Sequence, residues 1–181
     1  MRHSALVRVT HWVTATSFVA LVVSGIAILL AHPRLYWGET GVLGEPSLVD
    51  LPLPMILTGQ TGWGRYLHFL AAWSCVLAAL AYLPASVRAG HFAKYTRPQR
   101  IVYRIVVFVL FPLMVWTGLA MSPAMTSAIP VLVTTLGGQQ SARTIHFVVA
   151  NLLLVFVVGH VAMVAMSGFT RQVGAMMVGR A

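Results

Sequence analysis

The stretch Arg143-Thr-Ile-His146-Phe-Val-Val-Ala-Asn-Leu-Leu-Leu-Val-Phe-Val-Val-Gly-His160 decides the fold. It is an apolar run with a histidine near each end, fourteen positions apart. At about 100° and about 1.5 Å per residue, a helix brings both histidines to within roughly 40° of one face, about 21 Å apart along its axis. An ionisable side chain inside a membrane span is costly and marks a functional site by default. We therefore expect two stacked sites along one transmembrane helix.

The composition of the whole chain is that of a membrane protein. Of its 181 residues, 59% are hydrophobic and only 8% are charged, whereas soluble domains carry about 25% charged residues. A net charge of +9 would favour nucleic-acid binding in a soluble protein. Here the basic residues flank apolar runs, so we expect a lipid bilayer and no nucleic acid as partner. The single cysteine, Cys75, excludes an internal disulfide and is predicted to be a small buried residue.

Four apolar segments predict an all-α membrane protein, a four-transmembrane-helix bundle that forms one domain over residues 1–181. The predicted spans are about 9–30, 65–84, 101–121 and 143–168. The first span follows basic residues, as in a signal peptide, but its apolar run is too long for one. Pro112 should kink the third span. Residues 126–136 are too few to cross a bilayer and are predicted to lie at its interface.

The segment 32–64 is rich in Gly and Pro and cannot cross lipid unsupported. Its length and its Trp, Tyr and Leu content predict a long, ordered surface loop. It holds all three acidic residues of the chain: Glu39, Glu45 and Asp50. Basic residues collect on the inner side of a membrane, and of the twelve Lys and Arg residues only Arg34, Arg65 and Arg143 fall on the side of this loop. We therefore expect both termini inside and the loop outside.

Four histidines pair by depth in this topology. His68 and His146 begin spans 2 and 4 on the outer side, and His11 and His160 lie in the inner halves of spans 1 and 4. Two neutral imidazoles from different helices at one depth are what bis-histidine ligation of a haem iron requires. We predict two haem b groups with irons about 20 Å apart. The inner pair matches less well, because His11 lies about one turn and His160 about two turns from the membrane edge.

Arginines accompany three of these histidines at the same offset: Arg8/His11, Arg65/His68 and Arg143/His146. Positions i and i+3 share a helix face, and each arginine lies one turn nearer the water. A guanidinium pairs well with a carboxylate, so all three arginines are predicted to contact haem propionates. Arginines that merely mark span ends and snorkel are the alternative.

Other roles for the histidines stay open. A lone histidine in a span can be a proton relay or a helix–helix hydrogen bond, which would suit a small transporter or assembly protein without haem. His3, His32 and His91 fall in tails or loops and are predicted to be solvated. The absence of a Soret band from the purified chain would favour the non-haem class.

Several motifs resemble the bacterial cytochrome b561 family, which includes the b-type cytochrome subunits of nickel–iron hydrogenases and respiratory formate dehydrogenase. The likeness covers all four spans and rests on these segments: Arg8-Val-Thr-His11-Trp12 with Ser24-Gly25, Gly64-Arg65-Tyr-Leu-His68, Phe111-Pro-Leu-Met-Val-Trp-Thr-Gly-Leu, and Arg143-Thr-Ile-His146 with His160. It implies a bacterial inner-membrane protein with two haems b, the outer held by His68 and His146 and the inner by His11 and His160. It also implies a quinone site near the inner haem, for which Arg8 and Trp12 are the candidates.

The same resemblance implies an electron-transfer subunit that links a periplasmic redox partner to ubiquinone or menaquinone. The loop 32–64 departs from the short family members, and Trp37-Gly-Glu-Thr-Gly and Asp50-Leu-Pro-Leu-Pro look like segments of cytochrome b subunits that accompany molybdopterin oxidoreductases. The partner is expected to dock on this loop. The short members imply an alternative, a stand-alone enzyme that oxidises superoxide and reduces quinone. The three acids in the outer loop disfavour such an anionic substrate.

Overall fold

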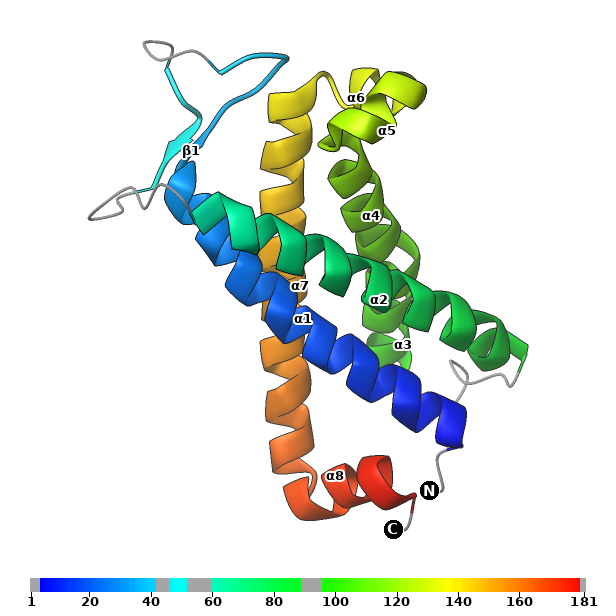
Figure 1. The fold of residues 1–181 in the computed structure, drawn as a ribbon. Coiled ribbons are helices and arrows are strands. Elements are labelled where there is room, and N and C mark those ends of the chain that lie inside the picture. Colours follow the sequence, from blue (N-terminus) through cyan, green and yellow to red (C-terminus); the bar gives the residue numbers. More distant parts are fainter. Residues whose placement is uncertain (1–3, 42–45, 52–59, 89–95, 180–181) are drawn as a thin grey trace. The chain divides into compact units, whose positions relative to one another are not determined.

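The computed structural model describes residues 4–41, 46–51, 60–88 and 96–179. Within these ranges the chain is mostly helical (Figure 1), and four helical stretches are long and apolar enough to cross a membrane. They are Ala5–Ala31, Gly62–Arg88, Arg97–Ala120 and Gln139–Met166, which confirms the four predicted spans. Predictions for His3, Glu45, His91 and Lys94 fall outside the described residues.

The chain divides into two compact units, which are described separately. The first comprises Met1–His32, Pro54–Tyr95 and Gly159–Ala181, and the second comprises Pro33–Leu53 and Thr96–Val158. The long helix α7 (Gln139–Met166) contributes residues to both units.

In the first unit, α1 (Ala5–Ala31) packs along α2 (Gln60–Arg88). Small residues form the seam: a Cβ on Gly64 would lie 3.4 Å from both the Ala27 Cβ and the Ser24 carbonyl oxygen. Lipid gives helices no hydrophobic reason to associate, so close packing of small residues holds such spans together.

Two helix ends in this unit differ from the predictions. A span end was predicted at Pro84, but α2 continues through this proline to Arg88. Membrane helices tolerate an interior proline because neighbouring groups satisfy the backbone it leaves free. No helix was predicted after span 4, but the chain turns at Gly168, with φ of 102°, and forms α8 (Phe169–Val178). Only glycine adopts this φ readily, so α7 ends and a new helix begins. Cys75 is buried with a free thiol, as predicted.

In the second unit, the third span contains a π-helical turn. The turn η2 (Val106–Leu110) joins α3 (Arg97–Ile105) to α4 (Phe111–Ala120). Pro112 lacks an N–H group, and its ring crowds the carbonyl of Phe108 four residues earlier. A wider turn makes room for that ring. The irregularity therefore lies beside the proline that led us to predict a kink, and it takes the form of a π turn.

Two short helices, α5 (Pro123–Ala128) and α6 (Val131–Thr134), connect α4 to α7. The indole Nε1 of Trp116 donates a hydrogen bond to the carbonyl of Leu132 at 3.0 Å, which ties α6 to α4. That this connection lies at the membrane interface stays a prediction.

Part of the predicted loop has strand structure. β1 (Arg34–Leu35) pairs with β2 (Val49–Asp50) in antiparallel register. Arg34 Nε donates to Asp50 Oδ2 at 3.2 Å. A side-chain hydrogen bond with Tyr36, followed by the charge of Asp50, raises the pKa of Arg34. The Leu35 side chain is only 1% exposed. That the loop as a whole is ordered stays a prediction.

The same segment caps the start of α7. The Gly38 carbonyl accepts hydrogen bonds from the backbone N–H groups of Gln140 at 3.0 Å and Ser141 at 3.3 Å, and Gly38 N–H donates to Ser141 Oγ at 2.7 Å. A Cβ on Gly138 would collide with the Gly38 carbonyl. Two consecutive glycines with positive φ, at 137 and 138, permit this approach. Helix α7 consequently begins at Gln139, four residues before the predicted start of span 4.

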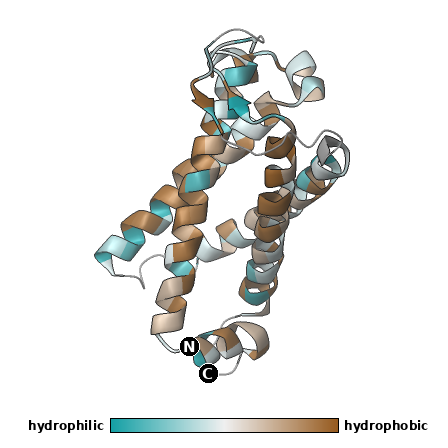
Figure 2. Ribbon diagram, turned by 90° about the vertical axis from the view of Figure 1, so that its left-hand side faces the viewer, coloured by the Kyte–Doolittle hydropathy of each residue, from teal (hydrophilic) through white to brown (hydrophobic). Residues whose placement is uncertain are grey.

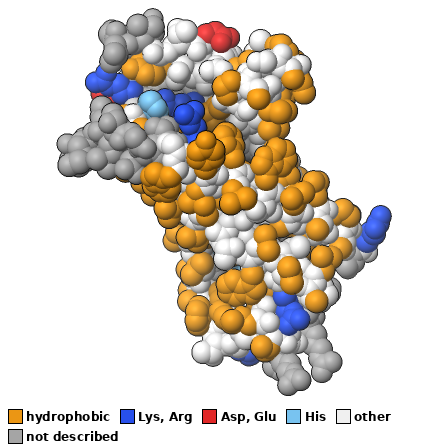
Figure 3. Space-filling model, in the orientation of Figure 1, with side chains coloured by type: hydrophobic (Ala, Val, Ile, Leu, Met, Phe, Trp, Pro, Cys, Tyr) orange, Lys and Arg blue, Asp and Glu red, His pale blue; other side chains and the backbone are white. Residues whose placement is uncertain are grey.

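The membrane-length helices expose many apolar side chains. Brown, hydrophobic residues run along the helices in Figure 2, and orange side chains are spread over the visible helical surface in Figure 3. Val155 is 70% exposed and Leu70 is 68% exposed. Water would disfavour apolar surface on this scale, whereas hydrocarbon solvates it. The exposed surface therefore fits an integral membrane protein.

Candidate functional site

His11 on α1 and His160 on α7 lie together in the first unit. Their ring centroids are 6.4 Å apart, and their planes are inclined by 62°. Two imidazoles that bind one metal from opposite sides have centroids about 6.3 Å apart, because imidazole–metal bonds are about 2.0 Å long and a ring of bonds near 1.35 Å puts each nitrogen about 1.15 Å from the centre. The observed separation therefore fits two axial ligands. The depth difference inferred from the sequence does not keep the rings apart.

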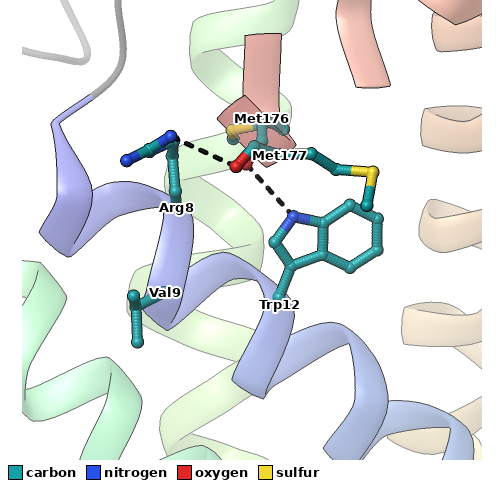
Figure 4. Close-up of a pocket in the computed structure, with 5 residues that line it drawn as sticks. All are labelled: Arg8, Val9, Trp12, Met176 and Met177. Atoms are coloured by element: carbon teal, nitrogen blue, oxygen red, sulfur yellow. Dashed lines mark hydrogen bonds between the residues drawn. The ribbon is translucent and has the colours of Figure 1, made fainter. Parts of the chain in front are cut away.

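The start of α1 is joined to the end of α8 beside this pair. Arg8 Nη1 donates to the carbonyl of Met177 at 3.1 Å, and Trp12 Nε1 donates to the carbonyl of Met176 at 3.2 Å (Figure 4). The last carbonyls of a helix have no partner within it, so both side chains cap α8. Together with Val9, these residues line a shallow surface hollow. The sequence did not reveal this role, because α8 itself was not predicted.

Arg8 also has a hydrogen-bond donor that is not used. Among the described residues, its Nε atom is buried and finds no hydrogen-bond acceptor. A buried donor without an acceptor is unfavourable, and a carboxylate or carbonyl oxygen of a bound group would satisfy it. The predicted contact of Arg8 with a propionate, and its candidate contact with quinone, are both compatible with this open donor.

His68 on α2 is held by a hydroxyl group of α1. Its Nδ1 atom lies 2.9 Å from Ser24 Oγ. Ser24 is fully buried, and its Oγ donates to the carbonyl of Ala20 at 2.6 Å. A serine hydroxyl has one proton, so the hydroxyl oxygen accepts from His68 Nδ1–H. In this tautomer, assigned from the hydrogen-bond pattern, Nε2 carries the lone pair, which is the form in which a histidine ligates a metal through Nε2.

His146 on α7 has the same arrangement within the second unit. Its Nδ1 atom lies 2.8 Å from Thr117 Oγ1 on α4. Thr117 is also fully buried, and its hydroxyl donates to the carbonyl of Leu113 at 2.8 Å. His146 Nδ1–H is therefore the donor to Thr117, and Nε2 of this ring likewise carries the lone pair.

A glycine follows each of these hydroxyl residues. A Cβ on Gly25 would lie 3.7 Å from His68 Cε1, and a Cβ on Gly118 would lie 3.6 Å from His146 Cε1. Each histidine therefore has a hydroxyl group at Nδ1 and a glycine, which has no side chain, beside Cε1. Ser24-Gly25 and the Thr-Gly of the third span stood out in the sequence only as family-like motifs, because the helix face that meets each histidine depends on tertiary packing.

The other two predicted arginines lie one turn from their histidines. Arg65 is exposed in α2. Arg143 is half-buried in α7 and interacts electrostatically with Tyr36, whose carbonyl accepts a hydrogen bond from Thr144 Oγ1 at 2.6 Å. Contact of these arginines with a haem stays a prediction.

The described residues offer ligands in pairs. Among them, no group of three or more His, Cys, Asp or Glu side chains could hold a metal ion. A haem iron needs only two axial ligands from the protein, and His11 with His160 has the separation for this. His68 and His146 belong to different units, so their pairing stays a prediction. His32 is exposed, as predicted.

Known proteins agree with these features. The family model of prokaryotic cytochrome b561 matches residues 2–179. A protein of Azospira oryzae, "Putative protein-methionine-sulfoxide reductase subunit YedZ1", is 29% identical over 198 aligned residues, which cover 91% of this chain and 90% of that protein. The family match confirms the resemblance drawn from the motifs: the chain belongs to the prokaryotic cytochrome b561 family.

Proposed function

We propose that this protein is the di-haem cytochrome b subunit of a quinone-linked oxidoreductase of the bacterial inner membrane. The family makes the chain a cytochrome b561-type membrane electron-transfer subunit and implies b-type haem. The observation that carries the finer proposal is the centroid separation of 6.4 Å between His11 and His160. The Nδ1 hydrogen bonds of His68 and His146, which fix the tautomer in which a histidine ligates a metal through Nε2, support it.

The four histidines have assigned places in this proposal. His11 and His160 hold the inner haem, and His68 and His146 hold the outer haem. The outer pairing rests on the sequence, in which each histidine begins a span on the outer side and follows an arginine by three positions. Bound haem supplies reversible one-electron chemistry. The chain ligates the iron, orients the imidazoles and offers guanidinium groups to the propionates.

The helix α7 sets the distance between the two sites. Along one helix axis, His146 and His160 are about 21 Å apart, which is most of the hydrocarbon thickness of about 30 Å. Two irons at these heights would provide a route for electrons between the two membrane surfaces. The inner site adjoins the hollow lined by Arg8 and Trp12, and we assign the quinone to this hollow. The indole and the open Arg8 Nε donor suit a ring that bears carbonyl groups.

The proposed partner is a periplasmic redox enzyme, of the molybdopterin type or similar, that docks on the segment 33–51. The relative from Azospira oryzae is named as a reductase subunit, which supports a partnership of this kind. Trp37 and Leu48 are exposed in this segment, and such residues are available for a protein contact. Gly38 of this segment also accepts hydrogen bonds from the start of α7, at Gln140 and Ser141. These residues lie a few positions before His146 on the same helix.

The experiment purifies the chain from its native membrane in mild detergent. We expect two low-spin haems b per chain, a co-purifying oxidoreductase, and reduction of the haems by a quinol. His68→Ala and His146→Ala should each remove the same haem, while the control His32→Ala keeps both. A chain without a Soret band would overturn the proposal. Haem reduction by superoxide near the diffusion limit in the lone chain, without any partner, would overturn the partner assignment.

A further inference from the structure

We propose that Ser24 and Thr117 are positioning residues that fix the tautomer of His68 and His146 and set the strength of these histidines as iron ligands. This inference rests on the haem ligation proposed above. It concerns two hydroxyl groups on α1 and α4 that make no contact with the metal themselves.

The direction of each hydrogen bond follows from counting protons. Ser24 Oγ lies 2.6 Å from the Ala20 carbonyl oxygen and 2.9 Å from His68 Nδ1. The carbonyl can only accept, so it takes the hydroxyl proton, and the ring N–H donates to Oγ. The His68 ring also hydrogen bonds to the backbone of Leu21, which lies on α1 as Ser24 does. Thr117 repeats this pattern toward His146.

The surroundings make these bonds hard to replace. Both hydroxyl groups are fully buried within candidate membrane spans. A serine or threonine in a helix satisfies its own proton by bonding back to a carbonyl of the preceding turn, so its oxygen remains free to accept. Water, which would otherwise accept a ring N–H, is scarce inside a bilayer. Removing the hydroxyl would therefore take the hydroxyl acceptor away from Nδ1–H, and the His68 ring would have to rely on the backbone of Leu21 instead.

The bond affects the opposite ring nitrogen. An acceptor at Nδ1–H fixes the ring orientation and makes Nε2 a stronger electron donor to a metal. Stronger donation favours ferric over ferrous iron, which lowers the reduction potential. Loss of the hydroxyl should therefore raise the potential of the haem and weaken its binding by about 10- to 100-fold, the range for partners of metal-ligating histidines.

The same arrangement of a hydroxyl group and a histidine occurs twice, once within each unit. Ser24 meets His68 in the first unit, and Thr117 meets His146 in the second. Both hydroxyl residues are followed by a glycine whose open side lies against Cε1 of the ring. One such contact could be incidental packing. Its recurrence at both predicted outer ligands points to a shared function.

The test compares midpoint potentials and ferric low-spin electron paramagnetic resonance signals of the purified holoprotein. Ser24→Ala and Thr117→Ala should shift one haem to higher potential, alter its low-spin signal and speed haem loss. Ser24→Thr and Thr117→Ser keep the hydroxyl and should restore wild-type values. The control variants are Ser74→Ala and Thr126→Ala, whose hydroxyls bond to the carbonyls of Leu70 and Ser122 in their own segments. These controls should leave both haems unchanged.

Potentials and signals that stay at wild-type values in both alanine variants would overturn the inference while the proposed function stands. The same conclusion follows if Ser24→Thr is as perturbed as Ser24→Ala, since packing would then be the cause. Where an alanine variant loses haem altogether, a wild-type potential in its hydroxyl-bearing counterpart supports the inference, and haem loss there refutes it. A wild-type chain without haem would instead overturn the proposed function.

Discussion

Replacing Gly138 by alanine should release the segment 33–41 from the start of α7. Gly138 has φ of 115°, and a Cβ there would collide with the carbonyl of Gly38. The obstacle is backbone rather than a flexible side chain, so the segment must move away. Its movement breaks the hydrogen bonds from Gln140 N–H and Ser141 N–H to the Gly38 carbonyl, together with the bond from Gly38 N–H to Ser141 Oγ.

The expected change in docking free energy is large for the addition of a single methyl group. The collision, together with a positive φ that costs alanine roughly 1–2 kcal/mol, disfavours the docked segment. Its release gives up three hydrogen bonds of about 1 kcal/mol net each, so about 3 kcal/mol of protection is lost, roughly a hundred-fold in the equilibrium between docked and released states. The four spans should persist, because their packing does not depend on this contact.

Amide hydrogen exchange of the protein in nanodiscs measures this change. Exchange at Gln140 and Ser141 should accelerate by up to about a hundred-fold in Gly138→Ala, since opening free energy sets the rate of protected amides. The matched control is Gly174→Ala in α8, where an added Cβ meets nothing within 4 Å and these two amides should exchange as in the wild type. Unchanged exchange at both amides in Gly138→Ala would refute the capping of α7 by Gly38.

Three further variants test separate contacts. Trp12→Phe removes the hydrogen bond to the Met176 carbonyl, so proteolysis within α8 should become several-fold faster, as about 1 kcal/mol of hydrogen-bond free energy is lost; resistance equal to wild type would show that the bond does not hold α8. Leu35→Ala removes a side chain that is 1% exposed and should lower the unfolding free energy of the segment by about 2–4 kcal/mol, seen as faster exchange of the β1–β2 amides. Gly64→Leu should push α1 from α2 at the contact with Ala27 and lower the thermal midpoint in detergent; a midpoint equal to wild type would contradict the close seam.

The broad architecture could be predicted because it depends on local composition. A run of about twenty apolar residues is long enough to cross a bilayer wherever it stands in the chain, so the four spans followed from hydropathy. The helix ends were less accurate. The predicted span 2 ended at Pro84, and α2 runs through this proline. The ten-residue helix α8 is too short to stand out as a membrane span and was not predicted.

The candidate site could be predicted only as far as residue type and depth allow. His11, His68, His146 and His160 stood out because ionisable groups are rare in such apolar surroundings. Their hydrogen-bond partners depend on how each helix is rotated about its axis, which four loosely amphipathic spans do not reveal. The partner of His68 lies forty-four positions away at Ser24. The docking of Gly38 on α7 is equally long-range and was not foreseen.

The measurement that tests the central claim most directly is the haem content of His11→Ala and His160→Ala, determined beside the wild type by reduced difference spectra and electron paramagnetic resonance. The proposed function predicts that wild type holds two low-spin haems b, and the centroid separation of 6.4 Å predicts that each variant loses the same one of them. Exogenous imidazole should restore the lost low-spin signal in both variants. The account would be contradicted if either variant kept both low-spin haems, or if the two variants lost different haems.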